Sequence, residues 1–204
     1  MKTDSDSTFK LVANGGFGEI KSTSLKAQIF EDVPRTHKSF AAIKYLKDEA
    51  IVKGYADGTF QPDGTLNRAE TVKMLVESFK IPNKEDAVAF TDINGGEWFN
   101  ESVKKAAANG LIKGYPDGSF QPGKTITKAE FLTIALRAAK LDVPKSTESP
   151  YTDVPTDTWF SDVFAYAKNK DLFEKSDTIK PHYPITREEA AVVIFELIKL
   201  ASVR

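Results

Sequence analysis

Basic residues recur at one place in a short motif that occurs three times along the chain. Its copies are Asn67-Arg68-Ala69-Glu70, Thr127-Lys128-Ala129-Glu130 and Thr186-Arg187-Glu188-Glu189. An Asn or Thr followed three residues later by Glu is typical of a capping box, which predicts that a helix begins at the second residue. The cation then occupies the first helical position, where the positive end of the helix dipole mildly disfavours it. We therefore expect the cations to serve an anion site, in which free backbone N–H groups and the side chain bind a carboxylate or phosphate together.

The remaining residues offer little for catalysis or metal binding. The chain has no cysteine and only two histidines, which argues against a thiolate zinc site, a cysteine nucleophile and a histidine-based triad. Asp92, Glu97 and Asp153 are carboxylates without a partner at a catalytic spacing. Asp57-Gly58 and Asp63-Gly64 lack the alternating oxygen ligands of a calcium loop and are better explained as turns. We expect no metal, no cofactor and no catalytic activity in this chain.

The charges almost cancel, because 28 Lys and Arg face 29 Asp and Glu, for a net charge of −1. Such a balance leaves no cation excess to follow a nucleic-acid backbone or an anionic membrane surface. The first eight residues are polar, and the longest apolar run, 190–195, is far shorter than the roughly 20 residues that span a bilayer. We expect neither a signal peptide nor a membrane span within this sequence.

The motif belongs to a longer internal repeat. An opening Phe/Tyr-x-Asp-Val/Ile turn recurs around Asp32, Asp92 and Asp153, at spacings of 60 residues (32 to 92) and 61 residues (92 to 153). The segment 54–62, Gly-Tyr-x-Asp-Gly-x-Phe-Gln-Pro, recurs at 114–122. Self-similarity at a fixed period indicates a repeat protein. The predicted divisions are 30–89, 90–150 and 151–204, forming one folded unit, with 1–29 as a linker or N-terminal extension.

Each copy predicts two helices joined by a loop. Apolar residues follow each opening turn at three-to-four spacing, and the second helix carries them at i, i+3, i+4 and i+7. The twelve positions of the second helices are Val72, Leu75, Val76, Phe79, Leu132, Ala135, Leu136, Ala139, Ala191, Ile194, Phe195 and Ile198. Asn109-Gly110 predicts the end of a first helix, and Phe60 and Phe120 are expected to turn back into the core. The predicted class is all-α.

The three copies resemble S-layer homology (SLH) repeats. The resemblance rests on the openers, on Trp98 and Trp159 six residues after their Asp, on the Gly-Tyr-x-Asp-Gly-x-Phe-x-Pro loop and on the basic motif, and it covers about residues 29–200. It implies a pseudo-threefold, three-pronged spindle around a central helical bundle. It also implies inter-repeat grooves that bind a secondary cell-wall polysaccharide, usually through a pyruvylated N-acetylmannosamine. An extracellular location at a bacterial cell wall or S-layer follows from it.

The resemblance implies nine ligand-binding residues. The cations would hold the carboxylate, the tryptophans would offer a flat face to a sugar ring, the glycines would permit close backbone approach, and the tyrosines stand beside them. They are Arg68, Lys128, Arg187, Trp98, Trp159, Gly54, Gly114, Tyr55 and Tyr115. From the residues alone, burial of the two tryptophans in the core is an equally good interpretation.

Departures from the family pattern argue against three equal sites. Copy one has Lys38 at the Trp position, Lys128 lacks the bidentate geometry of Arg, and copy three replaces the glycine loop with 174–179. We expect one or two competent grooves, with the groove built around Arg68 best preserved and copy three mainly completing the bundle. The resulting hypothesis is a non-catalytic cell-wall anchor, with binding to modified peptidoglycan or an S-layer self-assembly module as alternatives.

Overall fold

The computed structural model describes residues 29–85 and 89–202. It contains α1 (Phe40–Asp48), α2 (Arg68–Ser78), α3 (Asn100–Ala108), α4 (Lys128–Ala138), α5 (Ser161–Asn169) and α6 (Arg187–Ser202). These described residues form isolated bridges but no strand, so the all-α prediction is confirmed. The linker predicted for 1–29 lies outside the described residues, apart from Ile29.

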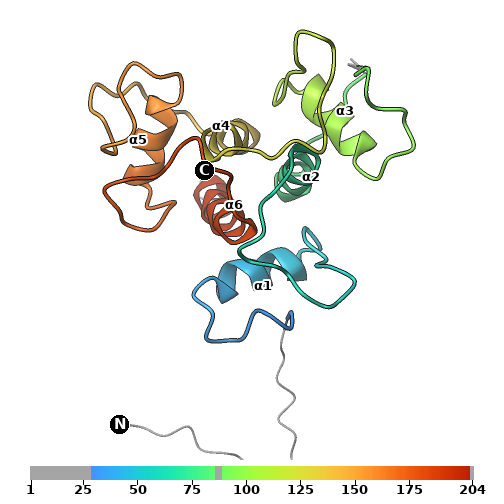
Figure 1. Ribbon diagram of the computed structural model, residues 1–204, viewed down its shortest axis with the longest axis horizontal. Coiled ribbons are helices and arrows are strands. Elements are labelled where there is room, and N and C mark those ends of the chain that lie inside the picture. The colour runs from blue at the N-terminus through green and yellow to red at the C-terminus, as the bar shows by residue number, and fades with distance from the viewer. Residues whose placement is uncertain (1–28, 86–88, 203–204) are drawn as a thin grey trace, which may run out of the picture.

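Three outer lobes surround a central bundle. Figure 1 shows α2, α4 and α6 in the centre, while α1, α3 and α5 each lie in a separate lobe with their loops. The central helices contact one another, and α1 packs on α6, α3 on α2, and α5 on α4. Each outer helix thus packs on the central helix of the preceding repeat, and the first repeat closes onto the last. The lobes agree in number with the expected prongs, whereas the threefold symmetry of a spindle stays a prediction.

Backbone hydrogen bonds join the segments that lead into the central helices. Leu66 N–H donates to Ile185 O (3.3 Å), Ile185 N–H to Ile126 O (3.2 Å), and Ile126 N–H to Leu66 O (3.1 Å). All three side chains are fully buried. The closed ring satisfies backbone groups that have no access to water, and it brings the three helix starts together in the middle of the molecule.

Each central helix begins with the predicted capping box. Asn67 Oδ1 accepts from Glu70 N–H (2.8 Å), and Glu70 Oε2 accepts from Asn67 N–H (3.0 Å). The same exchange occurs in α4 and α6, between Thr127 and Glu130 and between Thr186 and Glu189. The capping prediction is therefore confirmed in all three copies.

The first helix of repeat two ends where glycine predicted it. α3 stops at Ala108, Asn109 is the cap, and Gly110 has a left-handed backbone with φ of 71°. Ala50 and Asp171 take the same conformation at the matching positions, with φ of 57° and 49°. Left-handed geometry is unfavourable for residues with a Cβ, so these two helix ends are strained where the glycine is not.

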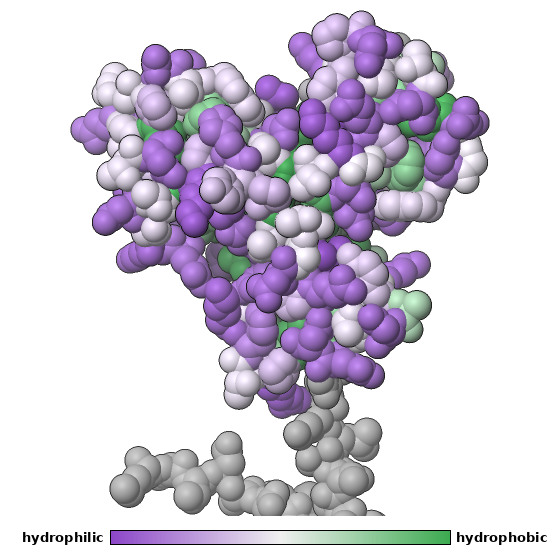
Figure 2. Space-filling view, in the orientation of Figure 1, coloured by the Kyte–Doolittle hydropathy of each residue, from purple (hydrophilic) through white to green (hydrophobic). Residues whose placement is uncertain are grey.

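The opening aspartates hold the loops of their own repeats. Asp32 accepts from Phe60 N–H (2.8 Å) and Gln61 N–H (2.7 Å). Asp92 and Asp153 make the same paired contacts. Phe60 and Phe120 are fully buried, which confirms that they turn into the core. Hydrophilic side chains cover most of the face in Figure 2, and apolar ones show mainly in recesses.

Candidate functional site

Arg68 reaches out of its own repeat and into the loop of the next one. It is only 8% exposed. Its Nε donates to the carbonyl oxygen of Phe120 (2.9 Å) and its Nη2 to that of Lys113 (3.4 Å). The guanidinium lies 4.8 Å from the ring centroid of Phe120 and 5.0 Å from that of Tyr115. Carbonyl and ring contacts offset the cost of a cation at a helix start and hold the group in one orientation.

Arg187 makes the equivalent contacts with repeat one. Its Nε donates to Phe60 O (2.7 Å), and the guanidinium lies 4.7 Å from the Phe60 ring and 4.8 Å from the Tyr55 ring. Tyr55 and Tyr115 therefore lie beside the arginine of a neighbouring repeat. Contacts between repeats of this kind depend on how the repeats pack, which no spacing within one copy predicts.

The backbone N–H groups at the helix starts are already occupied. Arg68 and Ala69 N–H donate to Lys124 O (2.9 Å) and Pro122 O (3.1 Å) of repeat two. The first two N–H groups of α4 and α6 likewise donate to carbonyls of repeats three and one, and the third is taken by the capping box. The expectation of free N–H donors is therefore wrong. Any anion recognition in this part of the chain depends on side chains.

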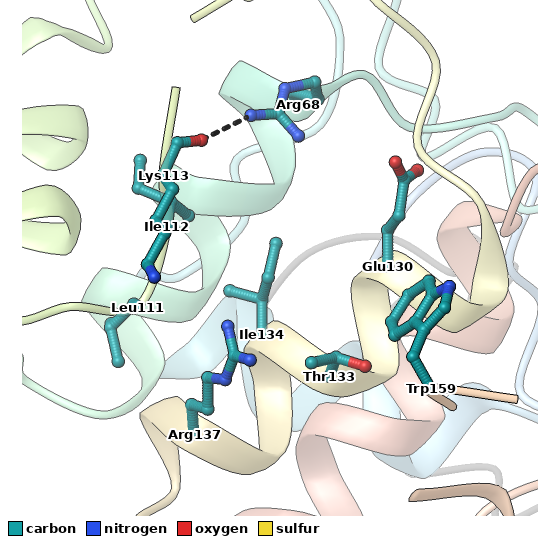
Figure 3. A pocket seen from close by; sticks show the side chains of 9 residues that line it. All are labelled: Arg68, Leu111, Ile112, Lys113, Glu130, Thr133, Ile134, Arg137 and Trp159. Atoms are coloured by element: carbon teal, nitrogen blue, oxygen red, sulfur yellow. Dashed lines mark hydrogen bonds between the residues drawn. The ribbon is translucent and has the colours of Figure 1, made fainter. Parts of the chain in front are cut away.

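A cavity of about 230 Å³ lies against Arg68, between repeats one and two. Leu111, Ile112 and Ile134 give it an apolar lining, and Trp159 of repeat three lies at its edge (Figure 3). Trp159 is 63% exposed and packs edge-on against its neighbour Phe160. Three repeats thus contribute to one recess that contains a fixed cation and an accessible indole.

Trp98, at the start of α3, is also accessible. It is 59% exposed and packs edge-on against Phe99, at 5.2 Å between ring centroids. Burial of the two tryptophans in the core, the competing interpretation, is therefore wrong. More than half of each side chain is accessible to a ligand.

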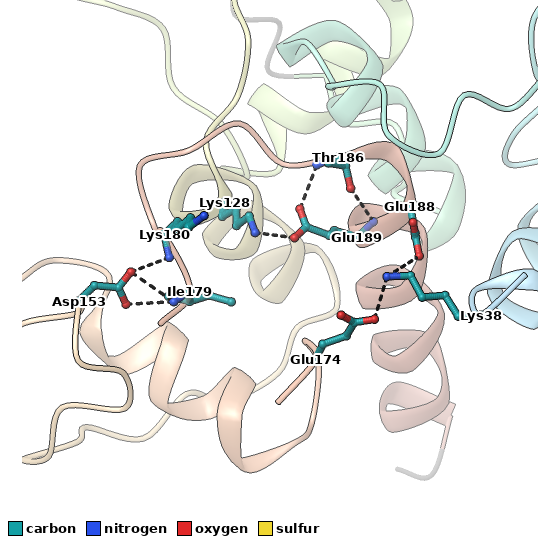
Figure 4. A network of polar contacts seen from close by, with 9 residues as sticks. All are labelled: Lys38, Lys128, Asp153, Glu174, Ile179, Lys180, Thr186, Glu188 and Glu189. Carbon is teal, nitrogen blue, oxygen red and sulfur yellow. Dashed lines mark hydrogen bonds and ion pairs between the residues drawn. The ribbon is translucent and has the colours of Figure 1, made fainter. Parts of the chain in front are cut away.

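The junction around Lys128 is closed by ion pairs. Lys128 Nζ donates to Glu189 Oε1 of repeat three. Lys38 is the repeat-one residue at the position that Trp98 and Trp159 occupy in the other repeats. It forms ion pairs with Glu174 (2.8 Å) and Glu188 (3.3 Å), as Figure 4 shows. The hydrogen bond with Glu174 raises the pKa of Lys38, and the same contact lowers the pKa of Glu174. Both cations of this junction already have carboxylate partners, unlike Arg68.

Gly54 and Gly114 allow a close approach within their own repeats. A Cβ on Gly54 would lie 2.3 Å from the ring of Phe30, and one on Gly114 would lie 2.7 Å from the ring of Phe90. The structure thus gives both glycines a packing role. A ligand contact at either glycine stays a prediction.

Comparison with known proteins decides the family. The sequence model of the S-layer homology domain matches residues 29–72, 89–132 and 150–191, more than half of the chain. The chain belongs to the S-layer homology domain family. Its three matches coincide with the three repeats found from internal similarity.

Relatives with similar sequences are much longer than this chain. A cellulosome-anchoring protein of Acetivibrio thermocellus is 34% identical over 134 residues, covering 64% of this chain and 30% of that protein. The S-layer protein sap of Bacillus anthracis is 28% identical over 185 residues, covering 87% and 22%. The exoglucanase XynX of Acetivibrio thermocellus is 28% identical over 198 residues, covering 90% and 18%. The chain therefore spans less than a third of these relatives.

Two further charged residues line the Arg68 cavity of the SLH unit and were not singled out from the sequence. Lys113 precedes the glycine of its loop, and Arg137 lies in the last turn of α4. Neither belongs to a conspicuous motif, although Arg137 stands where α2 and α6 have glutamates. Among the described residues, no group of three or more potential ligands could hold a metal ion, and no helix is long and apolar enough to cross a membrane.

Proposed function

We propose that this chain is a non-catalytic anchoring domain that binds an acidic bacterial cell-wall polysaccharide at the Arg68 cavity. The ligand we propose is a secondary cell-wall polymer that carries pyruvylated N-acetylmannosamine. In this proposal the domain lies outside the cell, at the cell wall or S-layer, and attaches a larger protein to it. Similarity to a cellulosome-anchoring protein and to S-layer proteins supports attachment to the cell surface.

One observation carries the proposal: a rigid guanidinium and an exposed indole share one recess. Arg68 uses Nε and Nη2 on protein carbonyls. Among the described residues, every fully buried polar side-chain atom except Thr71 Oγ1 has a hydrogen-bond partner. No nitrogen of Arg68 is therefore both fully buried and unpaired. Nη1 of Arg68 donates to none of the described residues, so it is not fully buried and can be reached from the cavity. A cation already fixed in place loses little entropy when it binds a carboxylate, which favours affinity.

The other lining groups suit a sugar. Trp159 offers an apolar face against which a pyranose ring can stack. Glu130 Oε2 is held by Thr127 in the capping box, and its second oxygen is left as an acceptor for a sugar hydroxyl or amide. Aromatic stacking combined with a few directed polar groups is the usual composition of a small-ligand site.

The contacts between neighbouring repeats form three junctions, built around Arg68, Lys128 and Arg187. They differ in whether the cation is free to bind an anionic ligand. The Arg187 junction has the same arginine geometry, with Tyr55 and Phe60. We propose it as a second, weaker site, to which Trp98 contributes as the repeat-two counterpart of Trp159. At the Lys128 junction Glu189, Glu174 and Glu188 already neutralise the cations. An anionic ligand would have to displace a carboxylate there, so we propose no binding at this junction.

Calorimetry with purified polymer, before and after removal of its pyruvyl groups, tests the function. Equal affinity for the two forms would refute recognition of the acidic group. Binding to peptidoglycan stripped of the polymer would support the peptidoglycan alternative, and association of the protein without polymer in light scattering would support self-assembly.

Trp159→Ala and Trp98→Ala form a matched pair for locating the site. Both side chains are exposed, so both variants should fold. Stacking that buries about 50 Å² of apolar surface is worth about 1.3 kcal/mol, or about ten-fold in affinity. We expect this loss for Trp159→Ala and a smaller one for Trp98→Ala. The reverse order would move the main site to the Arg187 junction.

A further inference from the structure

A second arginine, outside the repeated motif, faces the Arg68 cavity. Arg137 lines it together with Lys113. Figure 3 shows Arg68 on one side of the cavity and Arg137 on the other, with Ile134 between them. Arg137 is exposed, and it forms no ion pair with any residue that the structure describes. Its charge is therefore available to a ligand.

The fold does not require a cation at this position. Glu77 of α2 and Glu196 of α6 occupy the matching register, nine residues after the motif cation of each helix. Each pairs with a lysine of its own helix, at 3.8 and 2.7 Å. In α4 the residue four positions before Arg137 is Thr133, which carries no charge. Only α4 thus presents an unneutralised charge here, although a cation in a last helical turn is mildly favourable in itself.

The charges of the cavity exceed what one carboxylate can neutralise. Arg68, Lys113 and Arg137 are positive, and Glu130 is the one carboxylate in the lining. Glu130 and Arg137 are separated by two turns of α4, about 10 Å along the helix axis, and they form no ion pair with each other. Figure 3 shows Arg68 and Arg137 on opposite sides of Ile134, so one carboxylate bound by Arg68 leaves Arg137 without a partner.

We propose that this cavity recognises an oligosaccharide with anionic groups on two successive sugars, one bound by Arg68 and the other by Arg137. The inference rests on the proposed function and extends it from a single acidic sugar to an acidic segment of polymer. Arg137 acts as a specificity-determining residue that distinguishes the polymer from an isolated terminal sugar. The second anion is a carboxylate or a phosphate, because a guanidinium binds either group through two hydrogen bonds.

The test compares the binding of a monosaccharide that carries one acidic group with the binding of the whole polymer. Synthetic pyruvylated N-acetylmannosamine and purified polymer are titrated into the wild-type chain, Arg137→Gln and Arg35→Gln. Arg35 is an exposed arginine outside the cavity lining that makes no ion pair among the described residues, so its substitution controls for net charge. Polymer treated to remove either its carboxylates or its phosphates identifies the second anion.

We expect Arg137→Gln to weaken polymer binding by up to about five-fold, the effect of one solvent-accessible ion pair, and to reduce its salt dependence. Monosaccharide affinity should not change. Equal effects on the two ligands, no effect on the polymer, or the same loss in Arg35→Gln would overturn the inference and leave the proposed function standing. If the wild-type chain binds neither ligand, the proposed function itself fails.

Discussion

Replacing Arg68 with alanine should weaken the fold as well as ligand binding, because the side chain ties two repeats together. The variant loses a buried charged hydrogen bond to Phe120 O, worth about 1.5–3 kcal/mol. It also loses the contact with the Tyr115 and Phe120 rings, worth about 0.5–1 kcal/mol. The expected decrease in the free energy of unfolding is therefore about 2–4 kcal/mol.

Urea unfolding followed by fluorescence of the two tryptophans measures this loss. With a slope of about 2–3 kcal/mol per molar urea, the midpoint should fall by about 1 M. Arg187→Ala is the matched control, since its contacts are nearly identical, and it should lose a similar amount. Arg68→Lys keeps the charge but cannot reproduce the Nε bond and the stacked plane, so most of the loss should remain. A wild-type midpoint for Arg68→Ala would refute the structural role assigned to this arginine.

Three other substitutions test a strained helix end, a close glycine contact and an ion pair between repeats one and three. Ala50→Gly should raise the free energy of unfolding by up to about 1 kcal/mol in urea denaturation, because glycine relieves the left-handed strain; a decrease would contradict this. Gly114→Ala should lower it by about 1–3 kcal/mol, since the new Cβ meets the Phe90 ring at 2.7 Å, and an unchanged value would remove the packing role. The Lys38–Glu174 pair should contribute between about pH 4.5 and 10.5. It is lost in acid as Glu174 protonates below its lowered pKa, and in base as Lys38 deprotonates above its raised pKa. Both side chains are largely exposed, so the melting temperature of Glu174→Gln should lie slightly below wild type at pH 7 and converge with it in acid; a constant difference at all pH values would contradict the assignment.

Most of the local structure was predictable because it depends on neighbours in the chain. The capping boxes at Asn67 and Thr127, the helix end at Gly110 and the burial of Phe60 follow from short-range spacing and backbone preference. The repeat could also be predicted from the sequence, since each copy preserves the same spacing of apolar residues. These features need no knowledge of how the copies pack.

The sequence predicted which residues belong to the candidate site, but it did not predict how residues of different repeats come together there. The sequence by itself determined the all-α repeat, the motif cations and the two tryptophans as candidate sugar-binding rings, because each is a property of one copy. The exposure of those rings was decided by the structure. Only the tertiary structure decided that Arg68 meets the loop of repeat two, that Trp159 completes its cavity, and that Arg137 faces it from α4. It also decided that the helix-start N–H groups are occupied and that the Lys128 junction is closed. The physical reason is that each outer helix packs on the central helix of another repeat, so every junction combines residues whose separation along the chain carries no local pattern.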